Sequence, residues 1–113
     1  MTGPPPAARL RRLPSLEVLG IEVPVATGVR ARLLGLAFLD RDEAGPGLLI
    51  PRCSGVHTFG MRFELDLFFL DRDGRTRSVR RRVSPRRFAW DRSAAAVLEL
   101  PSEGRDLRPR RSR

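Results

Sequence analysis

The chain carries most of its hydrophobic residues in short runs, and several of these runs alternate with polar residues as half-buried β-strands do. The strongest run covers residues 63–71 and is rich in Leu and Phe. The turn sequence Asp71-Arg-Asp-Gly74 follows it and leads into residues 75–83. We therefore predict a hairpin formed by these two strands.

The other elements are shorter. Residues 16–25 alternate as one strand, which Pro24 places at a sheet edge because proline cannot donate a backbone hydrogen bond. Residues 47–50 and 94–100 are apolar runs that precede prolines, and we predict a strand at each. Apolar residues at helical spacing predict one helix at about residues 28–38, with Thr27 before it as the capping residue. The apolar stripe of this helix consists of Val29, Leu33, Leu36 and Ala37.

Together these elements predict a small α+β domain with one helix and a mostly antiparallel, curled or barrel-like β-sheet. A chain of 113 residues has room for one core. We expect Phe88 and Trp90 to close one end of it. We also expect a flexible leader at residues 1–15, the single domain at 16–101 and a basic disordered tail at 102–113, because both ends lack periodic apolar residues.

The formal net charge of +9 lies mainly at the ends of the chain. Residues 1–16 carry three Arg and no acid (+3), and residues 105–113 carry five Arg and one Asp (+4). The 14 Arg and 12 acids between them leave only +2. All 22 basic residues are Arg, which is typical of codon bias in a high-GC prokaryotic genome. Charge alone gives only sequence-independent attraction to nucleic acid, so we interpret the basic ends as solvated.

One region keeps weak nucleic-acid binding open as an alternative function. Arg75 to Arg92 contains eight Arg, with Phe88 and Trp90 interleaved as stacking groups. The single Cys cannot form an internal disulfide and fits a reducing compartment. No apolar run approaches the ~18 residues of a membrane span, and the N-terminus lacks the apolar stretch of a signal peptide. We therefore expect a cytoplasmic protein without a membrane partner.

Cys53, His57 and Met61 are spaced four residues apart and include the only Cys and the only His. Their soft donor atoms suit Cu(I) better than zinc. However, they offer only three ligands, and Gly55 and Gly60 interrupt any regular element that would place them on one face. We therefore expect no metal and no cofactor, and we expect Cys53 and Met61 to pack in the core.

A second constellation combines Cys53, His57 and Asp66 as nucleophile, base and orienting carboxylate. No oxyanion hole can be identified beside it. Asp66 lies in an apolar strand, where a carboxylate must find donors, so we expect it to accept hydrogen bonds from backbone N–H groups or from Arg62 or Arg32. An alternative interpretation makes Asp66 the polar floor of a small pocket beside His57.

Four groups of residues also appear in the order and spacing of a known family. They are Arg32-x-x-Gly35-Leu36, Gly47-Leu-Leu-Ile50, Val56-His-Thr-Phe-Gly-Met-Arg-Phe-x-Leu-Asp-Leu-x-Phe-Leu-Asp71 and Val97-Leu-Glu-Leu-Pro101. In these the chain resembles the small uncharacterised prokaryotic family called domain of unknown function 192. It has the variant His-Thr-x-x-Met where many relatives have Trp-Met-x-Asn-Thr. Glu64 stands where the family usually has proline, and residues 102–113 lack the apolar content of the family's last helix and strand.

The resemblance implies a domain whose biochemical role is unassigned. We predict a ligand-binding or accessory module with a pocket near His57 and Asp66. The residues expected to line this pocket are His57, Asp66, Thr58, Arg62, Arg32 and Cys53. A metal-binding or cysteine-dependent enzyme using Cys53 and His57 is the alternative, with Met61 as a third metal ligand. The sequence leaves open whether there is any catalysis.

Overall fold

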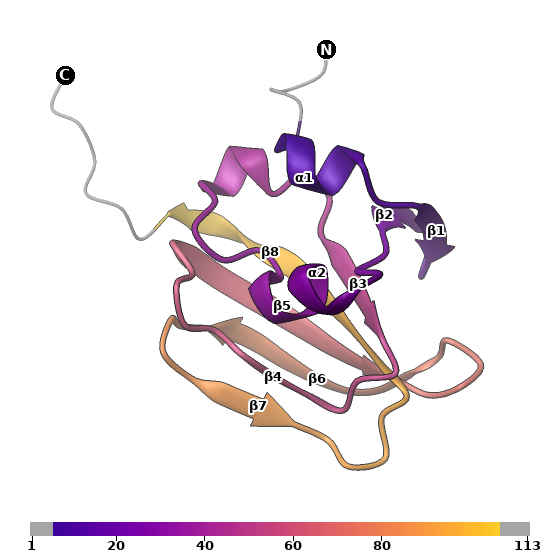
Figure 1. Ribbon diagram of the computed structural model, residues 1–113. Coiled ribbons are helices and arrows are strands. Elements are labelled where there is room, and N and C mark those ends of the chain that lie inside the picture. The colour runs from indigo at the N-terminus through magenta and orange to yellow at the C-terminus, as the bar shows by residue number, and fades with distance from the viewer. Residues whose placement is uncertain (1–5, 107–113) are drawn as a thin grey trace, which may run out of the picture.

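The computed structural model describes residues 6–106 of the chain (Figure 1). In chain order the elements are α1 (Ala8–Arg11), β1 (Ser15–Val18), β2 (Ile21–Pro24), α2 (Val29–Leu34), the 3-10 turn η1 (Arg41–Glu43), β3 (Leu48–Pro51), β4 (Gly55–His57), β5 (Phe63–Leu70), β6 (Thr76–Val83), β7 (Phe88–Trp90) and β8 (Ala96–Asp106).

The strands form three antiparallel sheets. The largest has the order β3-β8-β5-β6, and β1-β2 and β4-β7 are two-stranded ribbons beside it (Figure 1). The predicted small α+β fold with mostly antiparallel strands is confirmed. The sheets are not closed into a barrel. The β5–β6 hairpin forms as predicted, and Asp71 Oδ1 accepts hydrogen bonds from the backbone N–H groups of Asp73 and Arg75 in its turn.

The alternation of β5 builds the core. Phe63, Leu65, Leu67 and Phe69 point to one face of the sheet and are fully buried in the main hydrophobic cluster. Each such side chain contributes about 1.5–3 kcal/mol by leaving water. The other face of the sheet carries a smaller cluster under the β1–β2 ribbon, which contains Val18, Val23, Leu49, Leu70 and Leu98.

The structure corrects two predicted elements. Residues 16–25 form the β1–β2 hairpin instead of one strand, because Leu19 and Gly20 adopt positive φ angles and reverse the chain. Helix α2 ends at Leu34, since Gly35 leaves the helical region with φ 52° and ψ −128°. The helix begins at Val29, and the residue at its N-cap is Gly28. The predicted cap, Thr27, makes no capping hydrogen bond.

The predicted apolar stripe of the helix is also wrong. Val29 and Leu33 are 74% and 66% exposed, and no residue of α2 is buried. Leu36 and Ala37 are buried, but they lie in the loop after the helix. The helical spacing of these four residues therefore did not reflect a shared buried face.

Phe88 and Trp90 do not close the core. They are 67% and 62% exposed, whereas Ala89 between them is buried. Successive residues of a strand point to opposite faces, so β7 turns its small residue inward and its two aromatic residues outward.

The structured region extends past both expected boundaries, residues 16 and 101. Helix α1 lies within the expected leader, and its Leu10 is only 3% exposed in the main cluster. Strand β8 continues through Pro101 to Asp106, and its register with β5 shifts directly after the pairing of Pro101 with Leu65. Residues 107–113 of the expected tail lie outside the described residues. Among residues 6–106, no helix is long and apolar enough to cross a membrane.

Candidate functional site

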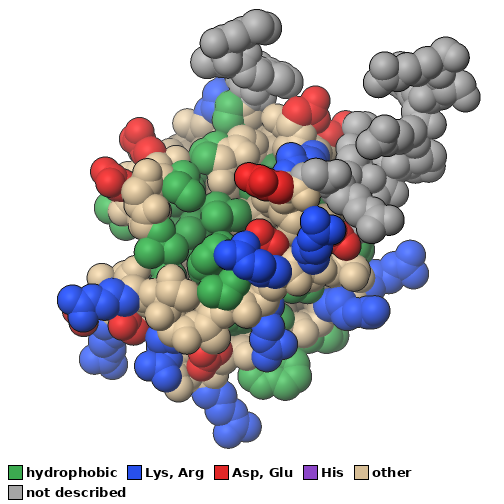
Figure 2. All heavy atoms as spheres, turned by 180° about the vertical axis from the view of Figure 1, so that it is seen from behind, with side chains coloured by type: hydrophobic (Ala, Val, Ile, Leu, Met, Phe, Trp, Pro, Cys, Tyr) green, Lys and Arg blue, Asp and Glu red, His purple; other side chains and the backbone are tan. Residues whose placement is uncertain are grey.

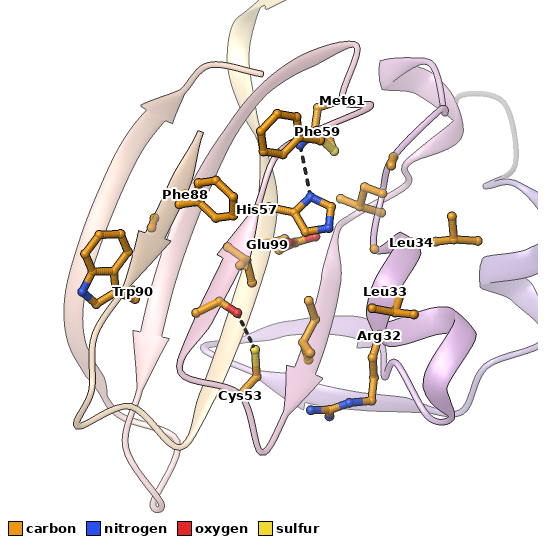
Figure 3. Close-up of a pocket in the computed structure, with 17 residues that line it drawn as sticks. Arg32, Leu33, Leu34, Cys53, His57, Phe59, Met61, Phe88, Trp90 and Glu99 are labelled. Carbon is orange, nitrogen blue, oxygen red and sulfur yellow. Dashed lines mark hydrogen bonds between the residues drawn. The ribbon is translucent and has the colours of Figure 1, made fainter. Parts of the chain in front are cut away.

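A cavity of about 380 Å³ lies between the β4–β7 ribbon and the segment formed by α2 and the loop after it (Figure 3). This volume is at the lower end of the range for small-molecule pockets. Apolar residues make up most of its wall, including Leu36, Ile50, Val56 and Met61. Four ionisable side chains also line it, and these are Arg32, Cys53, His57 and Glu99.

Glu99 provides the carboxyl group at the base of this cavity. It lies on β8 opposite Leu67 of β5, so its side chain points to the main core face. The side chain is 3% exposed, and no donor within residues 6–106 reaches its Oε1. Desolvation by burial raises the pKa of Glu99 from 4.5 to about 8. At neutral pH the carboxyl group is therefore mostly protonated.

Gly35 makes room for this carboxyl group. A Cβ atom at position 35 would lie 3.1 Å from Oε1 of Glu99. Gly35 also has the positive φ angle that ends α2, so one residue both stops the helix and lets the chain pass close to Glu99.

His57 stands at the end of β4, above Glu99 in the view of Figure 3. Its Nδ1 accepts a hydrogen bond from the backbone N–H of Phe59 at 3.2 Å. A neutral ring in this position carries its proton on Nε2 and can donate it. The ring centroids of His57 and Phe59 are 5.8 Å apart, and those of Phe59 and Phe88 are 5.3 Å apart in an edge-to-face pair.

Cys53 and Arg32 lie at the other side of the cavity. The thiol of Cys53 donates to the carbonyl of Gly55 at 3.0 Å. The guanidinium of Arg32 donates to the carbonyls of Pro51 and Arg52, and thereby ties α2 to the loop after β3. Cys53, His57 and Arg32 are thus the predicted site residues that the fold brings to one cavity.

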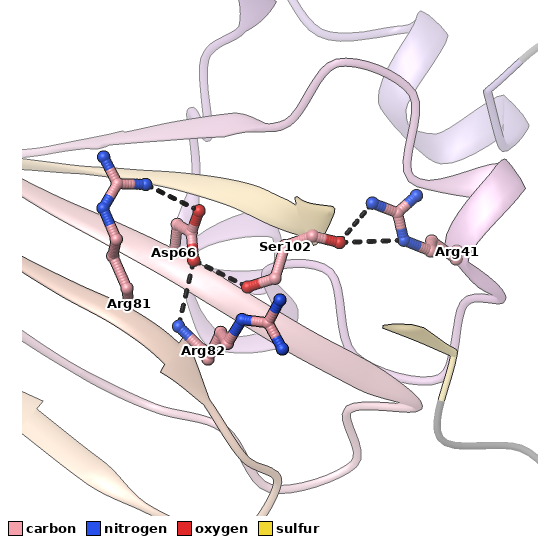
Figure 4. A network of polar contacts seen from close by, with 5 residues as sticks. All are labelled: Arg41, Asp66, Arg81, Arg82 and Ser102. Carbon is pink, nitrogen blue, oxygen red and sulfur yellow. Dashed lines mark hydrogen bonds and ion pairs between the residues drawn. The ribbon is translucent and has the colours of Figure 1, made fainter. Parts of the chain in front are cut away.

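Asp66 does not line this cavity. Its side chain lies on the opposite face of β5, where Ser102 Oγ donates to it at 2.7 Å and the backbone N–H of Arg82 at 2.9 Å (Figure 4). Arg81 forms an ion pair with it at 3.1 Å. The expectation that Asp66 finds donors is confirmed, but its arginine partner is Arg81 instead of Arg62 or Arg32.

Thr58 and Arg62 also have other partners. Buried Thr58 donates its hydroxyl to the carbonyl of Ser84 at 2.7 Å and accepts from the N–H of Arg87 at 2.8 Å. Arg62 forms an exposed ion pair with Asp40 at 3.0 Å. These two residues hold loops together outside the cavity. Met61 does line it, but the described residues contain no cluster of three or more His, Cys, Asp or Glu that could hold a metal.

On the face seen in Figure 2, the described residues carry no continuous stripe of basic side chains. Basic and acidic side chains are interspersed there around a hydrophobic area. Arg81, for example, pairs with Asp66 and lies over the ring of Phe68 at 5.5 Å from its centroid. This arrangement differs from the unmixed basic surface that typically attracts nucleic acid.

Residues 14–106 match the domain-of-unknown-function family 192 (DUF192, "Uncharacterized ACR"). The chain belongs to this family. No curated protein matches it significantly. The fold is similar to that of a protein of unknown function from Novosphingobium aromaticivorans DSM 12444, with a TM-score of 0.57 and 20% identity over 71% of this chain and 62% of that one. It is also similar to a "putative transcription regulator" from Sinorhizobium meliloti 1021, with a TM-score of 0.65 and 22% identity over 78% of each chain.

Sequence reasoning missed Glu99 as a site residue of this DUF192 domain. The signal was present, because Glu99 is the one charged residue in the apolar run from Val97 to Leu100. The sequence did not show where this run lies in the sheet. Strand β8 is central in its sheet, and Glu99 lies on the face that the main hydrophobic cluster and the chain at Gly35 cover.

Proposed function

We propose that this DUF192 domain is a small-molecule binding protein whose ligand occupies the cavity above Glu99. The observation that carries the proposal is a buried carboxyl group at the base of a mostly apolar cavity, whose Oε1 has no hydrogen-bond donor among the described residues. Such a group costs stability unless it gains a hydrogen-bonding or charged partner. Because the described residues offer this oxygen no hydrogen-bond donor, a ligand in the cavity is the partner that would stabilise the carboxyl group.

Binding explains the geometry better than cysteine-dependent catalysis does. A Cys-His hydrolase needs a carboxylate that orients the imidazole. Asp66 instead accepts hydrogen bonds from Ser102, Arg81 and Arg82 on the other face of the sheet. The thiol of Cys53 donates to a backbone carbonyl, as a structural cysteine does. A ligand in the cavity would contact the Nε2 side of His57 and the carboxyl group of Glu99.

The proposal can be tested with a panel of small fragments that includes cationic, neutral and anionic molecules. His57 and Trp90 are the only residues of their types, and both line the cavity. Their imidazole and indole resonances therefore report binding by NMR. We expect at least one fragment to shift both resonances, and we expect Glu99→Gln to change its affinity by about tenfold, the effect of one buried charged contact.

Glu103→Gln is the matched control, because Glu103 is an exposed residue of the same strand. It should leave the affinity of every fragment unchanged. The proposal fails if no fragment of any charge shifts both resonances. It also fails if the fragments that do bind have the same affinity for the parent and for Glu99→Gln.

A further inference from the structure

The cavity offers a ligand very few free polar groups. The donors of Arg32 are directed to the carbonyls of Pro51 and Arg52, and the thiol of Cys53 is directed to the carbonyl of Gly55. Among the described residues that line the cavity, Glu99 has a buried carboxyl oxygen, Oε1, without a hydrogen-bond partner. The ligand group that pairs with Glu99 therefore decides mainly whether a cation, a neutral molecule or an anion binds.

The mouth of the cavity carries a second feature that favours positive charge. Phe59, Phe88 and Trp90 line the cavity and are 44%, 67% and 62% exposed (Figure 3). They come from β7 and from the loop after β4, so the ribbon itself presents their rings. The faces of aromatic rings carry partial negative charge and attract cations.

On the basis of the proposed binding function, we propose that the ligand is a small organic amine whose ammonium group pairs with Glu99, while its apolar part contacts Phe59, Phe88 and Trp90. A carboxylate and an aromatic rim both attract a cation, and both would repel or fail to hold an anion. The cavity volume of about 380 Å³ limits the amine to a small molecule.

Binding of the amine is coupled to a proton. Before binding, the carboxyl group of Glu99 is mostly protonated at neutral pH, because burial raises its pKa to about 8. An ammonium ion needs the carboxylate, so Glu99 gives its proton to solvent, and close to one proton is released for each amine bound near pH 6. A neutral ligand that accepts a hydrogen bond would instead keep this proton in place.

The other titratable groups around the cavity would modulate this effect. These groups are His57 on β4 and Cys53 after β3, both of which line the cavity. Arg32 on α2 is positive throughout. A pH profile of binding therefore has to be compared with that of Glu99→Gln, which retains all three of these groups.

The test compares benzylamine with benzyl alcohol, which has the same ring and a neutral head group. Affinity is measured by titration calorimetry and by the fluorescence of Trp90, the only Trp. We expect benzylamine to bind the parent at least about tenfold more tightly than benzyl alcohol at pH 8, as one charged contact would allow. Between about pH 6 and 8 the affinity for benzylamine should rise roughly tenfold or more, because the carboxylate fraction of Glu99 rises.

In Glu99→Gln the advantage of benzylamine over benzyl alcohol and most of the pH dependence should disappear. Glu103→Gln should behave as the parent does. Phe88→Leu keeps an apolar side chain at an exposed position but removes the ring, and we expect it to weaken benzylamine and benzyl alcohol alike, by about two- to fivefold, because both place the same ring there.

The two proposals fail in different ways. If benzyl alcohol or benzoate binds as tightly as benzylamine, or if Glu99→Gln leaves the preference for benzylamine intact, the cavity binds ligands but the amine proposal is wrong. If no fragment of any charge binds the folded parent, the binding function itself is wrong. A calorimetric measurement in buffers of different ionisation enthalpy that detects no proton release near pH 6 would also contradict the pairing with Glu99.

Discussion

At the scale of single residues, Glu99 and Asp66 show how position decides what a carboxyl group does. Both occur in apolar strands. Asp66 has a backbone N–H, a hydroxyl and a guanidinium as donors, and these stabilise its charge. Glu99 has no donor to Oε1 from the described residues and is held neutral by burial. Asp66 therefore stabilises the sheet, whereas Glu99 is free for another partner.

The raised pKa of Glu99 predicts a specific dependence of stability on pH. An acid with a pKa of about 8 in the folded state and 4.5 in the unfolded state binds more protons when the chain is folded. Between these two values, its contribution to the free energy of unfolding is present at low pH and is lost as the pH rises. The limit of this loss is about 5 kcal/mol, at about 1.4 kcal/mol per pH unit.

We expect Glu99→Gln to remove this component, so that the variant becomes more stable than the parent at pH 8 and loses the advantage near pH 5. Denaturant unfolding at a series of pH values measures the difference between the two proteins. Glu103→Gln should follow the parent. A constant difference across the whole pH range would show that Glu99 does not titrate there.

At the scale of elements, the positions of glycine residues decide which segments can approach one another. Gly47 precedes β3 with a φ angle of 136°, and a Cβ atom there would lie 2.4 Å from the carbonyl oxygen of Glu99. Gly74 also has a positive φ angle, 81°, but no heavy atom beyond its two chain neighbours lies within 4 Å of its Cβ position. Substitution of Gly74 by Ala therefore measures the cost of the backbone conformation alone, whereas substitution of Gly47 adds the cost of a steric collision.

We expect Gly47→Ala to destabilise the protein by about 3 kcal/mol or more, because the β3–β8 pair must shift to relieve the collision. Gly74→Ala should cost only about 1–2 kcal/mol, the penalty for a left-handed residue. Chemical denaturation measures both. Equal costs would mean that the approach of β3 to β8 is looser than the structure shows.

At the scale of the whole molecule, the main core depends on a segment that lies outside the predicted domain. Leu10 of α1 is buried in the main cluster, and Arg9 donates to the carbonyls of Gly35 and Ala37 beside the cavity. The N-terminal segment therefore covers the core and supports the loop that faces Glu99.

Removal of residues 1–12 should lower the free energy of unfolding by about 2–5 kcal/mol, the usual cost of losing a buried Leu. Leu10→Ala in the full chain should reproduce most of this loss. Leu16→Ala is the matched control, since Leu16 is 53% exposed and should change stability by less than about 1 kcal/mol. A truncated chain as stable as the parent would show that α1 is dispensable for the core.

The sequence by itself determined the α+β class, the β5–β6 hairpin with its turn, the strands β3 and β5, and the need of Asp66 for donors. These features depend on local pattern, namely alternation, turn residues and a charge among apolar neighbours. The family could also be identified from sequence, because its motifs have a fixed order and spacing. Likewise, the sequence singled out Cys53 and His57, which do share a cavity.

Only the tertiary structure decided which face of each element is buried. Ala89 is inward and Phe88 and Trp90 are outward because β7 packs on the main hydrophobic cluster with the face that carries Ala89. Asp66 and Glu99 lie on opposite faces of one sheet because of strand register, which no local pattern specifies. The carboxyl group that shares the cavity with His57 is therefore that of Glu99, 42 residues away in the sequence, and it is buried because the chain at Gly35 passes close over it.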